Sequence, residues 1–228
     1  MKTKHFFGLV ISTALLANGS FAQQQLAAND NAFSVSVDGK EFKTQPRRIK
    51  IGAFWYITAN AAKPDKSLRF WFVNWSSNEI PPAGIYKIVP ERYDPSRAEI
   101  EALMLKYKGY AYMKYVEETR EPRMEYHVGK VKDDNAGEIE ITASSEKGME
   151  GKFSVKMDGT YWKERTSATV FGGLGRLKDK LVDKAVTNAT GYDQEIDPEG
   201  NGYRRQDQKD EVVMTNGKWS LKLVKDPK

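Results

Sequence analysis

The chain has no cysteine, only two histidines and no hydrophobic run long enough to cross a bilayer. Without cysteine it has no disulfide, no thiol nucleophile, no thiolate metal site and no cysteine that could carry a lipid. Charged residues make up 29% of the 228 residues, and the mean hydropathy is -0.64. These values exclude a polytopic membrane protein.

The first 22 residues have the layout of a secretory signal peptide. Lys2 and Lys4 precede an apolar run from Phe6 to Ala17, and small residues close the segment at Ala22. As a helix the run would span roughly 18 Å, against roughly 30 Å for a bilayer core, so it is too short for an anchor. We expect cleavage after Ala22 and export to the periplasm or the outside of the cell. The remaining 34 basic and 31 acidic residues leave a charge of +3, which does not indicate a nucleic-acid partner.

Cleavage would remove His5 and leave His127 as the only histidine. One histidine cannot form a two-histidine zinc site, and no Gly-x-Ser-x-Gly sequence presents a nucleophile. His127 lies in the alternating segment from Met124 to Val131, which predicts a strand whose histidine faces solvent. The segment Asp197–Gly202 resembles the start of a calcium loop, but Gln208 stands where the loop needs a glutamate, so we expect a polar loop. The sequence predicts no catalytic residue, no metal site and no cofactor.

Most of the chain reads as short strands separated by turn residues, which predicts a mainly β fold, an antiparallel β-sandwich or a partly closed barrel of eight to ten strands. Asp38-Gly39 and Asn216-Gly217 each favour a two-residue hairpin turn. The segment from Ile49 to Ile57 reads as one strand. The other expected strands are Phe33–Val37, Leu68–Trp75, Ile85–Val89, Tyr110–Val116, Met124–Val131, Glu138–Thr142, Gly151–Met157 and Glu211–Val224.

Two accessory helices are expected, at about 97–107 and at about 174–187. Ser96 and Glu99 fit a capping box before the first helix, and Gly109 would end it. An apolar stripe with lysines around it marks the second helix. The polar residues that follow predict a long, mobile loop over Thr187–Asp210. We therefore expect a signal peptide at 1–22, a polar leader at 23–32, and a single β-rich domain at 33–228 with a helical or flexible insertion at about 160–210.

Short motifs resemble uncharacterised secreted proteins and lipoproteins of Bacteroidota. They are a strand with "V-D-G-x-x-F" within 33–42, a "G-x-Y" strand start within 82–86, and a "G-x-I-x-I" strand at 137–142 followed by "G-x-F-x" at 151–155. The likeness extends over about 33–157. It implies a β-sandwich of unknown function, with no catalytic residue to carry over. The chain departs from the family because it lacks the usual lipid-bearing cysteine, so tethering to a membrane is not implied.

Aromatic residues gather in the first part of the chain, where 16 of the 23 that follow Ala22 lie between Phe33 and Val131. The segment Leu68–Trp75 is apolar on both faces, although a sandwich strand needs only one apolar face. The second face is therefore either covered by a helix or loop, or is a surface for a ligand. Side chains four residues apart on a strand lie about 13 Å apart, which suits successive units of an extended glycan. The candidate ligand-binding residues are Trp55, Trp71, Trp75, Tyr110 and Tyr112.

We conclude from the sequence that the chain is an exported, non-enzymatic binding protein with an aromatic-lined sheet face for a glycan, a peptide or a hydrophobic ligand. The alternative is a structural or assembly protein of the cell envelope that acts on a protein partner through the basic helix and the acidic loop after it. A hydrolase that uses Glu138 and Glu140 is a third possibility, although alternating glutamates are ordinary on a solvent-facing strand. Acidic residues interrupt the basic helix, so membrane association is not expected.

Overall fold

The fold is mainly β, as expected, with one helix in the part of the chain described by the computed structural model. That part comprises residues 31–51, 54–62, 65–76, 80–119, 125–133, 135–164, 198 and 203–223. Its elements are β1 (Ala32–Val37), β2 (Lys40–Thr44), β3 (Pro46–Ile51), β4 (Phe54–Ala62), β5 (Asp65–Asn74), β6 (Gly84–Ile88), α1 (Arg97–Met104), β7 (Gly109–Thr119), β8 (Glu125–Lys130), β9 (Gly137–Ser145), β10 (Gly148–Glu164) and β11 (Tyr203–Lys222).

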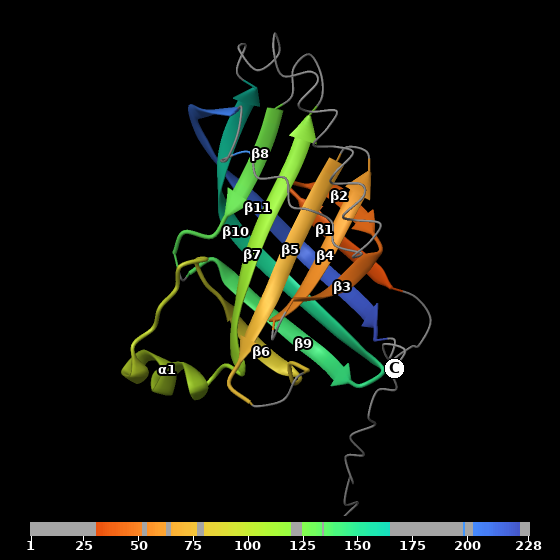
Figure 1. Cartoon of the computed structure of the whole chain (residues 1–228), viewed down its shortest axis with the longest axis vertical. Helices are drawn as coiled ribbons and strands as arrows, with labels where there is room; N and C mark the ends of the chain where they lie inside the picture. The colour runs from red at the N-terminus through yellow and green to blue at the C-terminus, as the bar shows by residue number, and fades with distance from the viewer. Residues whose placement is uncertain are drawn as a thin grey trace, which may run out of the picture.

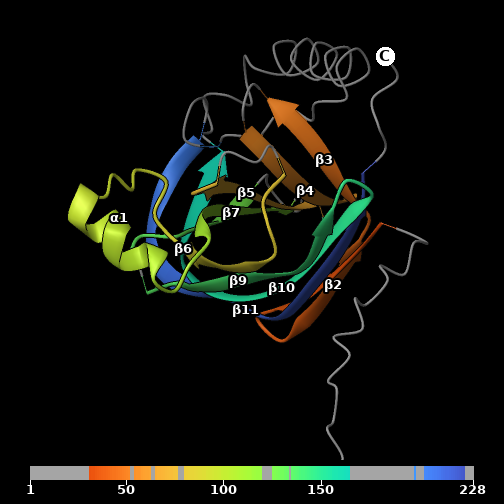
Figure 2. The same ribbon diagram turned by 90° about the horizontal axis from the view of Figure 1, so that it is seen from below.

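The strands form a single curved sheet in the order β2-β1-β11-β10-β9-β6-β7-β5-β4-β3. Strand β8 lies off this path and pairs with both β10 and β7, which closes β10, β9, β6, β7 and β8 into a five-stranded barrel. Neighbours are antiparallel except β6 and β7, which are parallel. Figure 2 shows β3, β4 and β5 on one side of the interior and β9, β10 and β11 on the other. The mainly β expectation is confirmed.

The core lies between these two sides and follows the two-residue period of a strand. On β5, Leu68, Phe70 and Phe72 point inward and are at most 4% exposed, whereas Trp71 and Val73 on the opposite face are only partly buried. A similar alternation runs along most of the other long strands, so each strand has one inner and one outer face, although Thr58, Val116 and Glu118 are also buried on the outer face. Hydrophobic burial on the inner face is the main stabilisation of the sheet.

The expected first helix is present and starts as predicted. Ser96 is the N-cap of α1: its backbone N–H donates to the Glu99 carboxylate at 2.7 Å, and the Glu99 N–H donates back to the Ser96 hydroxyl. This capping box satisfies amide groups that the first turn leaves free. The helix ends at Met104 rather than near 107, and Gly109 opens strand β7 instead of ending the helix. The expected helix at 174–187 lies outside the described residues (Figure 1).

One of the two expected hairpin turns is confirmed. Asp38 and Gly39 have φ values of 49° and 78° and join β1 to β2, with Val37 opposite Lys40. The turn expected at Asn216-Gly217 is wrong, because β11 runs straight through it. Asn216 has a φ of 55° and sits in a β-bulge, where β11 has one residue more than β10. Pairing with strands on both sides holds β11 extended there.

Two further expectations need new boundaries. The segment from Ile49 to Ile57 is not one strand, because Ile51 of β3 pairs with Phe54 of β4. The expected insertion at 160–210 is also too wide: β10 continues to Glu164 and β11 starts at Tyr203, so the expected mobile loop is strand over its last eight residues, 203–210. The expected signal peptide and nearly all of the polar leader lie outside the described residues.

Candidate functional site

Six aromatic side chains form a continuous row on the outer face of β4, β5 and β7. We call this set the aromatic row; its members are Tyr56, Trp71, Tyr112, Tyr110, Trp75 and Tyr93. Neighbouring ring centroids lie 5.3 Å apart for Tyr56 and Trp71, 5.0 Å for Trp71 and Tyr112, and 5.4 Å for Tyr112 and Tyr110. Tyr110 then contacts Trp75 at 5.4 Å and Tyr93 at 5.6 Å. These distances are those of favourable aromatic pairs.

The register of the sheet explains why the row forms. Trp71 lies directly opposite Tyr56 on one side and Tyr112 on the other. Side chains of directly opposed residues on one face of a sheet are in contact, so these three rings stack across the strands. Four of the five residues expected to bind a ligand, Trp71, Trp75, Tyr110 and Tyr112, are thus brought together.

Trp55 does not belong to the row. It pairs with Phe72, a core residue, and is therefore in register with the inner face of the sheet, while its neighbour Tyr56 takes the outer position beside Trp71. Alternation along the strand separates the two residues onto opposite faces. The Trp55 side chain lies outside the described part of the structure.

The row is neither fully buried nor fully open, since each of its six side chains is half-buried. The loop before α1 covers one end, where the Tyr112 hydroxyl donates to the Tyr93 carbonyl at 3.5 Å. Burial raises the pKa of Tyr112, and a hydrogen bond with Tyr110 and the nearby carboxylates of Asp94 and Glu91 raise it further. The phenol therefore stays neutral and donates, and acidic groups flank this end of the row.

Trp75 adds an unpaired donor to the same end. Its Nε1 is buried and has no hydrogen-bond acceptor among the described residues. The backbone there is fixed, because the Trp75 N–H donates to the Lys108 carbonyl at 3.0 Å. The backbone hydrogen bond to Lys108 and the contact with the Tyr110 ring therefore both fix the position of Trp75.

A second group of functional side chains lies on the inner face of the sheet, around His127. His127 Nε2 is 2.9 Å from Asp210 Oδ1, the Tyr161 hydroxyl donates to Asp210 Oδ2 at 2.8 Å, and the Tyr161 ring stacks on the imidazole at 4.3 Å. Burial and the bond to Asp210 raise the pKa of Tyr161 to about 12. The histidine side chain is only 12% exposed, so the expectation that it faces solvent is wrong.

Gly159 makes room for this group. A Cβ built on Gly159 would lie 1.8 Å from Asp210 Oδ1 and 2.6 Å from His127 Nε2. Sequence reasoning did not find the group because Asp210 is 83 positions from His127, and β11 was expected to begin only at Glu211. A glycine inside an otherwise alternating strand was the available signal, since such a glycine often marks a close approach.

Charged and polar side chains continue along the inner face beside His127. Glu117 of β7 pairs with His127 in the ladder, its carboxylate accepts from the Tyr115 hydroxyl at 2.8 Å, and it lies 3.1 Å from the Lys66 ammonium. Burial raises the pKa of Tyr115. The His127 and Glu117 groups therefore form a hydrogen-bonded polar layer beyond the apolar core, in which each carboxylate has a donor.

This polar layer offers no metal site that the structure reveals. Within the described residues no group of three or more histidine and carboxylate side chains is placed to hold an ion. The calcium-like segment at 197–202 lies outside those residues except for Pro198. No helix in the described part of the chain is both long and apolar enough to span a membrane.

Comparison of the chain with protein-family models, with curated proteins and with solved structures finds no match. The resemblance to secreted proteins of Bacteroidota therefore stays a prediction from its motifs.

Proposed function

We propose that the protein is an exported, non-enzymatic binding protein whose aromatic row binds a glycan. The observation that carries the proposal is the continuity of the row: from Tyr56 to Trp75, each ring contacts the next at 5.0 to 5.4 Å, and every ring remains half-buried. A core would bury such rings fully, and a soluble surface rarely carries so many together.

The shape and chemistry of the row suit a sugar chain. Tyrosine and tryptophan present flat apolar faces with a polar atom at the edge, at little cost in side-chain entropy. Trp71 lies on β5 and Trp75 directly follows its end at Asn74, and four residues of extended chain place the two surfaces about 13 Å apart. Asp94 and Glu91 at one end supply acceptors for hydroxyl groups. An extended peptide or a flat hydrophobic ligand would use the same rings without needing those carboxylates.

The test is titration of the protein with soluble oligosaccharides, in which binding affinity is measured by tryptophan fluorescence and by calorimetry. Peptides and lipids are titrated in parallel. Trp71 is central in the row, so we expect Trp71→Ala to cost about 2 kcal/mol of binding free energy, as central interface tryptophans do. That corresponds to affinity about 30-fold weaker. Tyr112→Ala should also weaken binding.

Trp162→Ala is the matched control. Trp162 is also a half-buried tryptophan, but it packs with Val116, Tyr126 and Val128, away from the row. Its replacement should leave affinity unchanged, and thermal unfolding of each variant shows that the fold is retained. Equal binding by wild type and Trp71→Ala, or no binding of any glycan, would overturn the proposal. Binding of peptides alone would also overturn the glycan assignment, although the aromatic row would remain a binding site.

A protein–protein role in the envelope has one observation in its favour. Helix α1 buries none of its residues, and Met104 and Leu105 at its end are 52% and 90% exposed. Figure 2 shows the helix projecting to one side of the barrel. If this is a contact surface, Leu105→Glu abolishes co-purification with an envelope partner and leaves glycan binding intact. The basic helix and the acidic loop expected to serve this role lie largely outside the described residues.

A further inference from the structure

The long sheet has two open edges that meet at one corner. β2 and β3 are the end strands of the sheet order, and only Gln45 separates them in the chain. At this corner the Thr44 hydroxyl donates to the Asn60 carbonyl, which connects β2 to β4. Within the described part of the chain, β2 pairs only with β1 and β3 only with β4. Among these strands, a seam without ladder hydrogen bonds therefore separates the two ends of the sheet.

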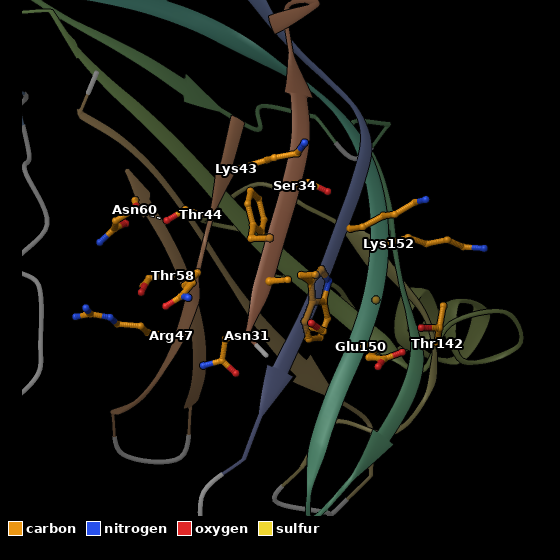
Figure 3. A pocket seen from close by; sticks show the side chains of 17 residues that line it. Asn31, Ser34, Lys43, Thr44, Arg47, Thr58, Asn60, Thr142, Glu150 and Lys152 are labelled. Carbon is orange, nitrogen blue, oxygen red and sulfur yellow. Dashed lines mark hydrogen bonds between the residues drawn. The ribbon is translucent and has the colours of Figure 1, made fainter. Parts of the chain in front are cut away.

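A hollow of about 1340 Å³ lies along this seam. Figure 3 shows Thr58 on one side of it and Thr142 and Glu150 on the other. Phe33 and Trp219 border the hollow but are 2% and 3% exposed, so they offer almost no surface to an occupant. The surface that remains is polar, with hydroxyl and amide side chains and four basic residues against Glu150; the basic residues are Lys43, Arg47, Lys152 and Lys218. This charge balance favours a polar occupant that carries negative charge.

Strand β3 carries the strongest positive charge along the seam. It has three basic residues and no acidic one, a net charge of +3, whereas β11 has five basic and three acidic residues, a net charge of +2. On β2, Glu41 neutralises Lys43, whose ammonium lies 2.7 Å away. Arg47 of β3 and Lys218 of β11 are exposed, and neither has an ion pair in the part of the chain that the structure describes. Both cations are therefore available to an anionic partner.

The open edge of β3 determines the form of that partner. Such an edge presents backbone N–H and C=O groups, with which an extended segment pairs as a further strand. A second copy of this chain fits badly, because two β3 edges would bring their basic residues together, and like charges opposite each other destabilise a sheet. An acidic segment would meet attraction instead. The basic residues thus disfavour copies of the chain and favour a partner of opposite charge.

The position of Arg47 defines where the acidic residues of the partner lie. Arg47 pairs with Thr58, the neighbour of the core residue Ile57, so it stands on the outer face of the sheet. A carboxylate directly opposite Arg47 on an added strand would contact it on that face. We propose that the edge of β3 binds an extended acidic segment of a protein partner, which extends the sheet by one strand and places alternate carboxylates on its outer face. This site is separate from the aromatic row, so the failure of either proposal leaves the other unaffected.

The test uses fluorescein-labelled heptapeptides, whose binding is measured by fluorescence anisotropy. The acidic probe alternates threonine, which favours strands, with glutamate, and its matched control has lysine in place of glutamate. We expect the acidic probe to bind about tenfold more tightly than the basic control. In amide hydrogen exchange followed by NMR, the β3 amides that do not pair with β4 should exchange about tenfold more slowly when the acidic probe is bound, because they then donate to it.

Two further probes separate strand addition from the attraction of charge alone. They have the acidic sequence with N-methyl groups either on the glutamates or on the threonines, so each lacks the amide donors along one edge of the strand. At least one of them should bind about tenfold more weakly than the unmethylated probe. Equal binding of all three acidic probes would show that no strand is added, and would refute the proposal.

Arg47→Glu should weaken binding of the acidic probe about tenfold, because it replaces an attraction with a repulsion. Arg97→Glu is the matched control: it makes the same change of charge at an exposed residue of α1, away from β3 (Figure 2), and should leave the affinity unchanged. If Arg47→Glu fails to fold, the four probes and the exchange rates decide on the wild-type chain. Absence of binding, equal affinity for the acidic and basic probes, unchanged exchange in β3, equal loss in both variants, or a dimer formed through β3 would also overturn the proposal.

Discussion

The close contact of Gly159 with the His127–Asp210 pair leads to a quantitative prediction. Replacing Gly159 with alanine would place a methyl carbon 1.8 Å from Asp210 Oδ1, far inside contact distance, so the carboxylate must move. Its hydrogen bonds to His127 and Tyr161, of 2.9 and 2.8 Å, would then be lost or stretched. The prediction therefore concerns the polar layer as a unit rather than a single contact.

The magnitude follows from these two bonds. A hydrogen bond to a charged group contributes about 1.5 to 3 kcal/mol, and the lower value applies because the Asp210 side chain is 33% exposed and water replaces part of what it loses. Alanine in place of glycine within a strand returns about 0.5 to 1 kcal/mol by restricting the unfolded chain. The net expectation is that Gly159→Ala lowers the free energy of unfolding by about 2 kcal/mol.

Urea unfolding at pH 7, followed by circular dichroism, measures this change. With a urea slope of about 2 kcal/mol per molar, the midpoint should fall by about 1 M. Asp210→Ala removes the nearer of the two atoms that the methyl group would meet and leaves His127 Nε2 at 2.6 Å, so Gly159→Ala should cost less in that background than in wild type, and the two substitutions should be non-additive. A neutral Gly159→Ala variant, or costs that simply add in the double variant, would refute the steric reasoning.

Two further predictions concern residues on β10 and β11. Because the pKa of Tyr161 is raised to about 12 in the fold, against about 10 in an unfolded chain, the folded state keeps a proton that the unfolded state loses. The resulting stability is present below pH 10 and lost as the pH rises toward 12; the urea midpoint should fall between pH 9 and pH 11.5, by less in Tyr161→Phe, and a constant midpoint would contradict this. Gly217→Ala should destabilise by about 1 to 3 kcal/mol through overpacking, because its Cβ would lie 2.5 Å from the Phe153 ring; a thermal melt like that of wild type would show that the bulge absorbs the methyl group.

Local sequence patterns predicted the structure correctly where a residue's conformation depends mainly on its neighbours in sequence. The capping box at Ser96 and Glu99 and the turn at Asp38-Gly39 need only local hydrogen bonds and local backbone freedom, and both are present. The two-residue period also placed Trp71 and Trp75 on the face opposite Phe70 and Phe72, which is how the aromatic row could be anticipated.

Pairing between distant strands could not be read from the same patterns. Asn216-Gly217 has the strongest local preference for a hairpin, yet β11 is held by β1 and β10 along this stretch, and the dipeptide becomes a bulge. His127 was assigned to solvent because its neighbours Tyr126 and Val128 looked like the core face. In fact that side of β8 packs into a small outer cluster, whereas His127 faces inward to Asp210. The two-residue period of a strand identifies its two faces but does not indicate which of them is buried.

The pairing of β10 with β11 shows why Gly217 was wrongly assigned to a turn. Three inward positions on this pair combine a glycine with a large or charged side chain directly opposite: Gly151 with Trp219, Gly217 with Phe153, and Gly159 with Asp210. At each, an added Cβ would come within 2.6 Å of the opposite side chain.

In sequence these glycines look like strand ends or turns, since glycine lowers strand propensity. In the structure each of these glycines leaves the space that the opposite side chain occupies on the neighbouring strand, namely that of Trp219, Phe153 or Asp210. The position of the Trp219 indole in the core and the His127–Asp210 pair therefore both depend on a glycine in the facing strand. A methyl group at Gly151 should displace the Trp219 indole from its place in the core, as one at Gly159 displaces the carboxylate.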